Sequence, residues 1–289
     1  MKKVLAAIGK ALGYFAVYLA ASNVVTLIVS YVTSFLVGRE AGQAGLDREA
    51  GMAMLQDRLN SITGLCLILG SILTLLIFFI VEKVKKSSLA KETDMKAVSG
   101  KQMLFTVIGA VGAMFFMNFM LSILPIPKEL IGDLTSGMSK LSAYPFWQAM
   151  LGNAILVPIT EEVVFRGYLF NRLEKAMPAI VAALISSAVF GICHGGIVWA
   201  IWAFCMGMLI CVVRMKSGSI IPGIVIHIIM NTFATITSYY PVLDNMTVPV
   251  MYALTIGGGI LVAVYITGIL TDKKTVGKKA EVQITSQKV

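Results

Sequence analysis

The chain has 289 residues, of which 57% are hydrophobic and 13% are charged, with a mean hydropathy of +0.85. Soluble domains carry about 25% charged residues, so half that fraction excludes an ordinary soluble domain and indicates a membrane protein. The formal net charge of +9 arises from basic residues that flank apolar runs, which favours anionic lipid headgroups over nucleic acid as their partner.

Eight apolar runs predict eight transmembrane helices, since about 20 apolar residues cross a hydrocarbon core of ~30 Å. In chain order the runs are Leu12–Val37, Ile62–Val81, Met103–Leu124, Phe146–Phe170, Ala179–Ile197, Trp199–Val213, Ile220–Ser238 and Val248–Leu270. No stretch between them is long enough to form a separate soluble domain. We therefore expect an all-α fold, that of a polytopic membrane protein.

The segments between the spans are polar and short. The first apolar run continues well past ~15 residues, which indicates a retained helix and not a cleaved signal peptide. Residues 39–60 carry mixed charge and are interpreted as helix that extends from a span, whereas residues 125–144 contain two prolines and predict a loop with a short helix. The tail after Thr271 is basic, and its composition is typical of disorder.

Basic residues predict the orientation of the spans. With the N-terminus in the cytoplasm, eighteen of the 24 lysines and arginines fall in cytoplasmic segments and five fall in external loops. The lysine-rich loop 82–101 and the tail are among the cytoplasmic segments. Because cytoplasmic loops of membrane proteins carry an excess of Lys and Arg, we expect both termini to lie inside the cell.

The fourth run contains the sequence TEEVVFRGYLF, which places three charged residues in an apolar helix. A charge at the centre of a bilayer costs at least ~2.5–3.5 kcal/mol, so such residues are rare and are usually functional. Residues four apart share one face of a helix, so Glu162 and Arg166 are predicted to neutralise each other. Glu161 points about 140° away from Arg166 and is left without this partner.

Both histidines of the chain, His194 and His227, lie in predicted spans, and Asn231 shares a helix face with His227. A buried histidine is more often a hydrogen-bonded packing residue than a ligand, and Glu–Arg pairs can simply hold helices together. Here, however, two imidazoles, a carboxamide and Glu161 come from three separate spans. This convergence favours a functional site over packing.

Helix lengths give these groups different depths in the membrane. Counted at about 1.5 Å per residue from the basic side, Glu161 lies at ~16 Å, His227 at ~15 Å and His194 at ~24 Å. The three side chains meet only if the helix of His194 begins below the membrane plane or tilts strongly. We expect a site near the middle of the bilayer, reached from the cytoplasm.

Two hydrolytic chemistries fit these groups. In one, Glu161, His194 and His227 bind a single divalent metal, most suitably Zn²⁺, with a position open for water. In the other, Glu161 is a general base for water and His227 and Asn231 stabilise an oxyanion, without a metal. The HExxH and GxSxG signatures are absent. Cys193 is a weaker candidate nucleophile, because it and its neighbour His194 do not share a helix face.

Three motifs then suggest a family. The sequences EEVVFR (161–166), FGICH (190–194) and HIIMN (227–231) resemble the EExxxR, FxxxH and HxxxN motifs of the CPBP family of CAAX-processing and bacteriocin-processing intramembrane proteases, formerly grouped as Abi proteins. The resemblance covers about residues 145–240. It implies that Glu161 and His194 activate water, that His227 and Asn231 complete the site, and that Glu162, Arg166 and Phe190 support it.

The resemblance also implies an organisation and a class of substrate. We expect a catalytic core at 145–240, preceded by three transmembrane helices in 1–144 and followed by the last helix and a basic tail in 241–289. The expected substrate is a membrane-embedded or lipidated peptide or protein, and the expected location is a bacterial plasma membrane. The alternatives are a non-catalytic bacteriocin self-immunity or scaffold protein and, less well supported, a proton-coupled transporter that uses Glu161.

Overall fold

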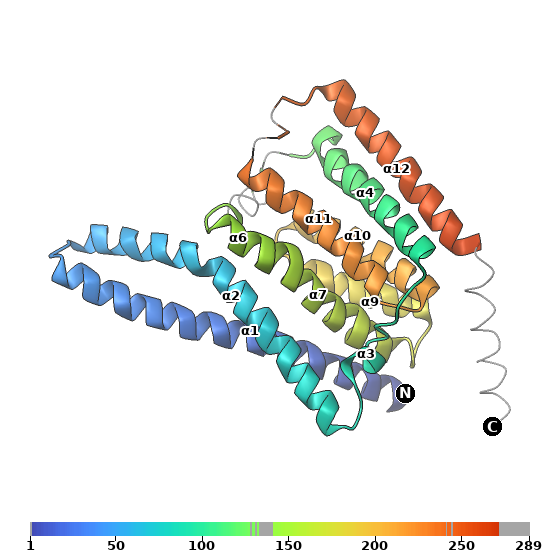
Figure 1. Cartoon of the computed structure of the whole chain (residues 1–289), viewed down its shortest axis with the longest axis horizontal. Coiled ribbons are helices and arrows are strands. Elements are labelled where there is room, and N and C mark those ends of the chain that lie inside the picture. Colours follow the sequence, from blue (N-terminus) through green and yellow to red (C-terminus); the bar gives the residue numbers. More distant parts are fainter. Residues whose placement is uncertain are drawn as a thin grey trace.

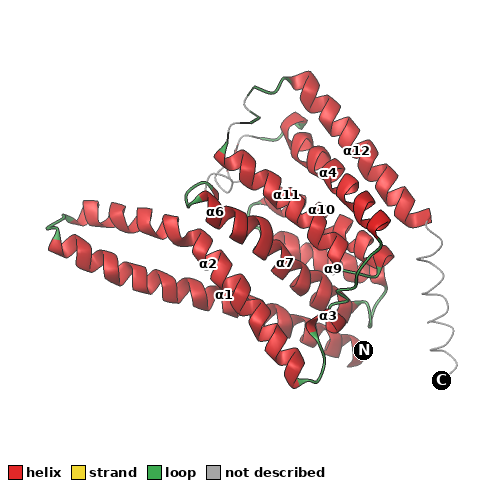
Figure 2. Cartoon of the chain, viewed as in Figure 1, coloured by secondary structure: helices red, strands yellow, loops and turns green. Residues whose placement is uncertain are grey.

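The computed structural model describes residues 2–127, 129–130, 132, 141–240, 242–243 and 245–271. Across these ranges the chain is helical and contains no strand (Figure 2). Six of the described helices are long and apolar enough to cross a membrane. The chain is therefore a polytopic all-α membrane protein, as predicted from its composition. The count of eight spans and the orientation stay predictions. The loop at 125–144 and the tail after Thr271 lie largely outside the described residues.

Two long helices, α1 (Lys2–Gln43) and α2 (Arg48–Val84), form an antiparallel hairpin whose tip extends away from the other helices (Figure 1). Gly45 closes α1 with a left-handed φ of 63°, a conformation that glycine adopts without strain. Asp47 then caps α2 by accepting a hydrogen bond from Ala50 N at 2.8 Å. The polar segment 39–60 is thus mostly helix that continues from the spans, as expected.

The helix that carries the acid pair lies in the middle of the molecule, between α2 and α11 (Ile221–Tyr239) (Figure 1). Two of its segments, of eight residues each, are wound as π-helix. Its consecutive parts are α6 (Phe146–Gln148), η1 (Ala149–Leu156), α7 (Val157–Glu162), η2 (Val163–Phe170) and α8 (Asn171–Leu173). All eight residues of η2 are buried, which makes this segment the centre of the apolar core. π-helical turns are rare and occur frequently at functional sites.

The fifth and sixth predicted spans form a close pair, but the boundary between them differs from the prediction. Helix α9 (Ala179–Ile192) ends five residues before the expected Ile197, and α10 (Ile197–Ser217) begins there. Gly195 and Gly196 have φ values of 67° and 46° in the intervening turn. Because L-residues rarely adopt positive φ, these glycines break the helix, and His194 lies in the turn and not in a span.

Helices α4 (Gly100–Ile123) and α12 (Val248–Thr271) pack side by side on the far side of α11 from the central helix (Figure 1). Small residues permit the close approach. A Cβ added at Gly258 would lie 2.6 Å from both the carbonyl oxygen of Gly112 and the amide nitrogen of Phe116. Glycine at such contacts lets helix backbones pack tightly in membranes, where no hydrophobic effect drives their association.

The lysine-rich loop is tied to the ends of the core helices. It contains the short helix α3 (Leu89–Glu92). Arg172 lies 2.6 Å from Glu92, and its hydrogen bond holds the pKa of that carboxyl below its ordinary value. Arg214 lies 2.7 Å from Asp94. Burial opposes ionisation of Asp94, but hydrogen bonds and charges from Lys96 and Arg214 outweigh it and lower its pKa.

Candidate active site

Glu161, His194, His227 and Asn231 line a single cavity of about 470 Å³. They come from α7, from the turn after α9, and from α11. The structure thus brings together the four side chains that the sequence singled out, including His194, whose helix length predicted a different depth. The other lining residues belong mainly to α4, η1, α10 and α11, and they are Asn118, Phe119, Leu121, Ser122, Leu124, Ile126, Leu141, Asn153, Val157, Trp199, Trp202, Met206, Phe233, Ala234, Thr237 and Leu243.

His227 lies between the two adjacent carboxylates. Its Nδ1 is 3.0 Å from Glu162 Oε1, and its Nε2 is 3.6 Å from Glu161 Oε2. Because an ionised carboxylate only accepts hydrogen bonds, Nδ1 carries the proton in the contact with Glu162. Nε2 then presents a lone pair to Glu161. The sequence predicted that Glu162 pairs with Arg166 alone, and it did not predict this bridge.

Glu162 and Arg166 form the predicted ion pair beneath the cavity. Arg166 Nη1 donates to Glu162 Oε1 at 2.9 Å, and both side chains are fully buried. Among the described residues, Glu162 Oε2 and the Nε and Nη2 of Arg166 are buried without a hydrogen-bond partner, so this ion pair carries a desolvation cost that its contacts only partly offset. The guanidinium also stacks on Phe190, with Cζ 4.5 Å from the ring centroid. Gly207 leaves room for it, since a Cβ there would lie 2.9 Å from Arg166 Nη2.

Phe190 connects these groups to both histidines. Its buried ring meets the imidazole of His194 edge-on at 4.5 Å between centroids and that of His227 at 5.7 Å. The phenylalanine therefore packs against Arg166 and against both imidazoles. This contact set gives a physical reason for an aromatic side chain at the first position of the FGICH motif.

Glu161 has a second neighbour that the sequence analysis missed. The Tyr18 hydroxyl, from α1, lies 3.4 Å from Glu161 Oε1 and donates to it. Glu161 is 9% exposed, and the exposed part faces the cavity. A polar signal for Tyr18 exists in the sequence, because Tyr14 and Tyr18 repeat at a four-residue interval on an apolar helix. Nothing local, however, predicts which partner they meet.

Asn231 is held by the backbone of the central helix. Its Nδ2 donates to the Asn153 carbonyl oxygen at 3.0 Å. In a π-turn the next backbone donor for that carbonyl is residue 158, which is a proline and has no N–H. The neighbouring Val157 N–H bonds to Gly152 instead. Pro158 therefore leaves a carbonyl available, and the amide of Asn231 takes it, which leaves its second N–H free.

His194 is oriented by the end of its own helix. Its Nδ1 lies 2.7 Å from the carbonyl oxygen of Phe190, and since a carbonyl only accepts, Nδ1 carries the hydrogen. The lone pair of the neutral imidazole is then on Nε2. Cys193, the alternative nucleophile, is exposed and is not among the residues that line the cavity.

The three residues expected to bind a metal, Glu161, His194 and His227, all line the cavity. Across the described residues, no three His, Cys, Asp or Glu side chains are grouped so that they could hold an ion. Nδ1 of each histidine is occupied, by Glu162 for His227 and by the Phe190 carbonyl for His194, so that Nε2 of each imidazole is the nitrogen left for a metal. The expected ligands Glu161, His194 and His227 are therefore not gathered around one point in this arrangement, and the binding of a metal stays a prediction.

The cavity lies toward the end of the bundle opposite the lysine-rich loop. Its lining includes the C-terminal part of α4, the N-terminal part of α10 and the C-terminal part of α11. The lysine-rich loop adjoins the other end of α4. This arrangement differs from the expectation that the site is reached from the cytoplasmic, lysine-rich side.

The sequence of this site is similar to that of known proteins. Residues 143–233, which hold all three motifs and the four cavity residues, match the family model described as type II CAAX prenyl endopeptidase Rce1-like. The family resemblance is thereby confirmed. The matched Rce1-like segment begins near the start of the central helix and ends within α11.

Two curated proteins are similar to the chain in sequence. The Lactococcus lactis protein YxdF, of the UPF0177 group, is 29% identical over 169 residues, which cover 56% of this chain and 90% of the relative. YdiL of Bacillus subtilis, described as a "putative membrane peptidase", is 33% identical over 90 residues, which cover 31% of this chain and 37% of that protein. No solved structure matches. The comparisons support an integral membrane protein and, in general, a membrane protease of the CPBP type.

Proposed function

We propose that this chain is an intramembrane endopeptidase that hydrolyses a peptide bond in a membrane-associated peptide or protein. The observation that carries the proposal is the meeting of Glu161, His194, His227 and Asn231 in one cavity. A carboxylate within an apolar bundle costs free energy of desolvation, and no structural role of Glu161 in the described part of the chain offsets this cost. Its presence at the cavity therefore favours a catalytic role.

Water is activated between Glu161 and His194. The carboxylate and His194 Nε2 both present acceptors to the cavity, so a water molecule can donate a hydrogen bond to each. Glu161 accepts one proton as the water oxygen attacks the peptide carbonyl carbon. A C–O bond forms, and the carbonyl oxygen becomes an oxyanion.

The two groups on α11 stabilise different parts of this intermediate. Asn231 uses one N–H for the Asn153 carbonyl and offers the second to the oxyanion. His227 has its Nδ1–H on Glu162 and its Nε2 lone pair toward Glu161, so it accepts a hydrogen bond from the newly protonated Glu161 carboxyl. This geometry favours His227 as the partner of Glu161 over a direct donor to the oxyanion.

Collapse of the intermediate returns the proton. The C–N bond breaks as Glu161 transfers its proton to the leaving nitrogen, so the carboxylate is regenerated and two peptide products result. Glu162 and Arg166 act through His227, because Glu162 fixes the imidazole that faces Glu161. Phe190 holds both imidazoles in place. These three residues position the others and do not contact the substrate.

The test is a comparison of membrane peptides by mass spectrometry in cells that contain the wild-type chain, Glu161→Gln or Glu49→Gln. Glu49 lies exposed at the hairpin tip, so its variant makes the same chemical change away from the cavity. We expect a set of cleaved peptides that depends on the wild-type and Glu49→Gln chains and is lost with Glu161→Gln. The same experiment identifies the natural substrate.

A non-catalytic role makes the opposite prediction. A self-immunity or scaffold protein keeps its cellular phenotype, and an unchanged peptide profile, in both Glu161→Gln and His227→Ala. That result in correctly folded variants would exclude the hydrolytic mechanism. Metal analysis of the purified chain separates the two hydrolytic chemistries, since stoichiometric zinc that is lost in His227→Ala contradicts the metal-free route.

A further inference from the structure

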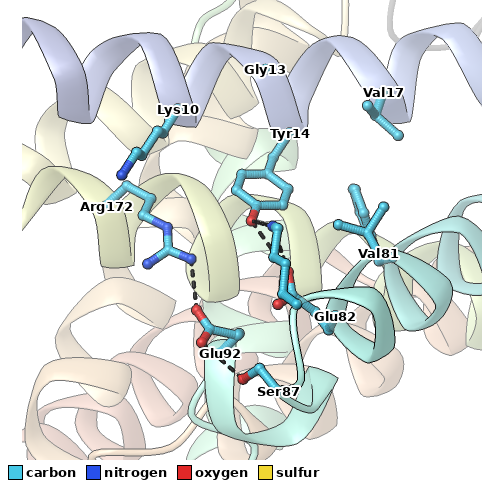
Figure 3. Close-up of a pocket in the computed structure, with 11 residues that line it drawn as sticks. Lys10, Gly13, Tyr14, Val17, Val81, Glu82, Ser87, Glu92 and Arg172 are labelled. Carbon is cyan, nitrogen blue, oxygen red and sulfur yellow. Dashed lines mark hydrogen bonds and ion pairs between the residues drawn. The ribbon is translucent and has the colours of Figure 1, made fainter.

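A second cavity, of about 530 Å³, lies between α1, the C-terminal end of α2 and the start of α8 (Figure 3). Its lining shares no residue with the cavity that holds Glu161. The apolar run of α2 ends at Val81, and the charged run of the lysine-rich loop begins at Glu82. The pocket therefore lies where hydrocarbon gives way to headgroups on the basic side of the membrane.

Cations outnumber carboxylates in this pocket. Lys10, Lys85 and Arg172 line it together with Glu82 and Glu92, which leaves one net positive charge. Lys85 pairs with Glu82 at 3.2 Å and Arg172 with Glu92 at 2.6 Å. In the part of the chain that the structure describes, the Lys10 ammonium has no ion-pair partner, and the buried Nε–H of Arg172 has no acceptor.

Glu82 is buried and contacts its neighbours through one oxygen, Oε1, whereas Oε2 is buried without a partner among the described residues. This side chain is 1% exposed, and its Oε1 lies near three donors, at 3.2 Å from the Tyr14 hydroxyl, 3.1 Å from that of Tyr168 and 3.2 Å from Lys85 Nζ. It therefore fixes Lys85 from within the protein. An anion that enters the pocket therefore contacts Lys10, which has no ion-pair partner among the described residues, and the exposed sides of Lys85 and Arg172. It does not contact the buried carboxylate of Glu82.

The opposite side of the pocket is apolar. Figure 3 shows the ammonium group of Lys10 and the guanidinium group of Arg172 on one side of the Tyr14 ring and the side chains of Val17 and Val81 on the other. Gly13 opens the wall, because a Cβ built there meets no atom within 4 Å. The pocket thus has a cationic end and an apolar end, which suit a ligand that carries both a phosphate and an acyl chain.

We propose that this pocket binds one anionic phospholipid through its phosphodiester, with the phosphate near Lys10 and Arg172 and an acyl chain along Val17 and Val81. The single excess positive charge suits the single negative charge of phosphatidylglycerol. Basic pockets between transmembrane helices on the cytoplasmic side bind anionic headgroups in this manner. This proposal does not depend on the proposed hydrolysis, and the two are tested separately.

Native mass spectrometry of the purified full-length chain measures the binding. We titrate dioleoyl phosphatidylglycerol and, as the acyl-matched control, dioleoyl phosphatidylcholine. Lys10→Gln is expected to weaken phosphatidylglycerol binding about fivefold, which corresponds to about 1 kcal/mol for one lysine near a lipid surface. Lys3→Gln makes the same change on nearly the same helix face two turns earlier, outside the pocket, and is expected to bind normally. Equal losses in both variants, or equal affinity for both lipids, overturn the proposal.

A charge-neutral pair tests the pocket itself. Gly13→Leu places a side chain in the open space, whereas Gly9→Leu adds the same side chain one turn away, where a Cβ also meets no atom within 4 Å and which does not line the pocket. We expect saturable phosphatidylglycerol binding to be lost in the first variant and kept in the second. Retained binding in Gly13→Leu contradicts the assignment.

The phosphate could also belong to a soluble molecule, and competition separates the two sources. Millimolar inorganic phosphate or glycerol 3-phosphate is expected to leave lipid binding nearly unchanged, because neither fills the apolar side. Complete displacement by these anions, with the same dependence on Lys10, would show that the pocket binds a soluble phosphate and that the lipid assignment is wrong.

Discussion

At the scale of single residues, the adjacent glutamates have different surroundings although they share one turn of helix. Glu162 is fully buried and contacts Arg166 and His227, whereas Glu161 faces the cavity with Tyr18 and the far nitrogen of the same imidazole. His227 therefore couples the two carboxylates. One acid lies in a buried ion pair, and the other faces the cavity, where the proposed hydrolysis requires it.

This difference predicts that replacing each glutamate by glutamine affects a different property: stability for Glu162 and activity for Glu161. Glu162→Gln leaves the buried Arg166 guanidinium without a counter-charge and is expected to lower the free energy of unfolding by about 3–5 kcal/mol. Glu161→Gln is expected to change stability far less while it abolishes cleavage. Thermal and denaturant unfolding of the two purified variants in the same detergent measures this. Equal stabilities would mean that Arg166 does not depend on Glu162.

At the scale of elements, the central helix is not a plain α-helix, and its irregularity orients Asn231. Two π-helical segments flank α7, and Pro158 within α7 leaves the Asn153 carbonyl to accept the side chain from α11. A regular helix would satisfy this carbonyl internally. The local winding thus creates a contact between two elements that a hydropathy profile does not register.

Close helix packing gives a prediction at the same scale, with neighbouring glycines as test and control. In Gly258→Ala the new Cβ meets backbone atoms of α4 at 2.6 Å, and in Gly257→Ala it meets no atom within 4 Å. We expect the first variant to lose about 1–3 kcal/mol through overpacking and the second to be neutral or up to about 1 kcal/mol more stable from helix propensity. Unfolding in detergent gives both values, and a stable Gly258→Ala would indicate that α12 can shift on α4.

At the scale of the whole molecule, the two cavities lie toward opposite ends of the bundle. The site of Glu161 extends toward the ends of α4 and α11 that are remote from the lysine-rich loop, and the basic pocket adjoins that loop. The side from which a substrate enters therefore depends on the orientation of the chain. Basic-residue asymmetry predicts that the lysine-rich loop is cytoplasmic.

Cysteine labelling tests this orientation directly. Ala44 lies at the exposed tip of the α1–α2 hairpin, and Ala97 is exposed in the lysine-rich loop, so each is replaced by cysteine in a separate variant. A membrane-impermeant maleimide applied to intact cells is expected to label the first variant and to label the second only after the cells are opened. The wild-type chain, which has four cysteines, supplies the background. The reverse pattern would invert the predicted topology.

The sequence by itself determined the class of the molecule and the residues of its candidate site. Apolar runs and helical spacing are local properties, so composition and periodicity were enough to predict an all-α membrane protein, the Glu162–Arg166 pair and the shared face of His227 and Asn231. The three motifs also suggested the family resemblance, which the match of residues 143–233 to the Rce1-like family model confirms. The domain boundaries and the catalytic roles of the site residues stay predictions.

Only the tertiary structure decided how these parts meet. It placed His227 between Glu161 and Glu162, brought Tyr18 from α1 to the cavity, and moved His194 from a span into a glycine turn. Each of these outcomes depends on distances between helices that are far apart in the chain. Such distances follow from long-range packing, which local spacing along one helix does not encode.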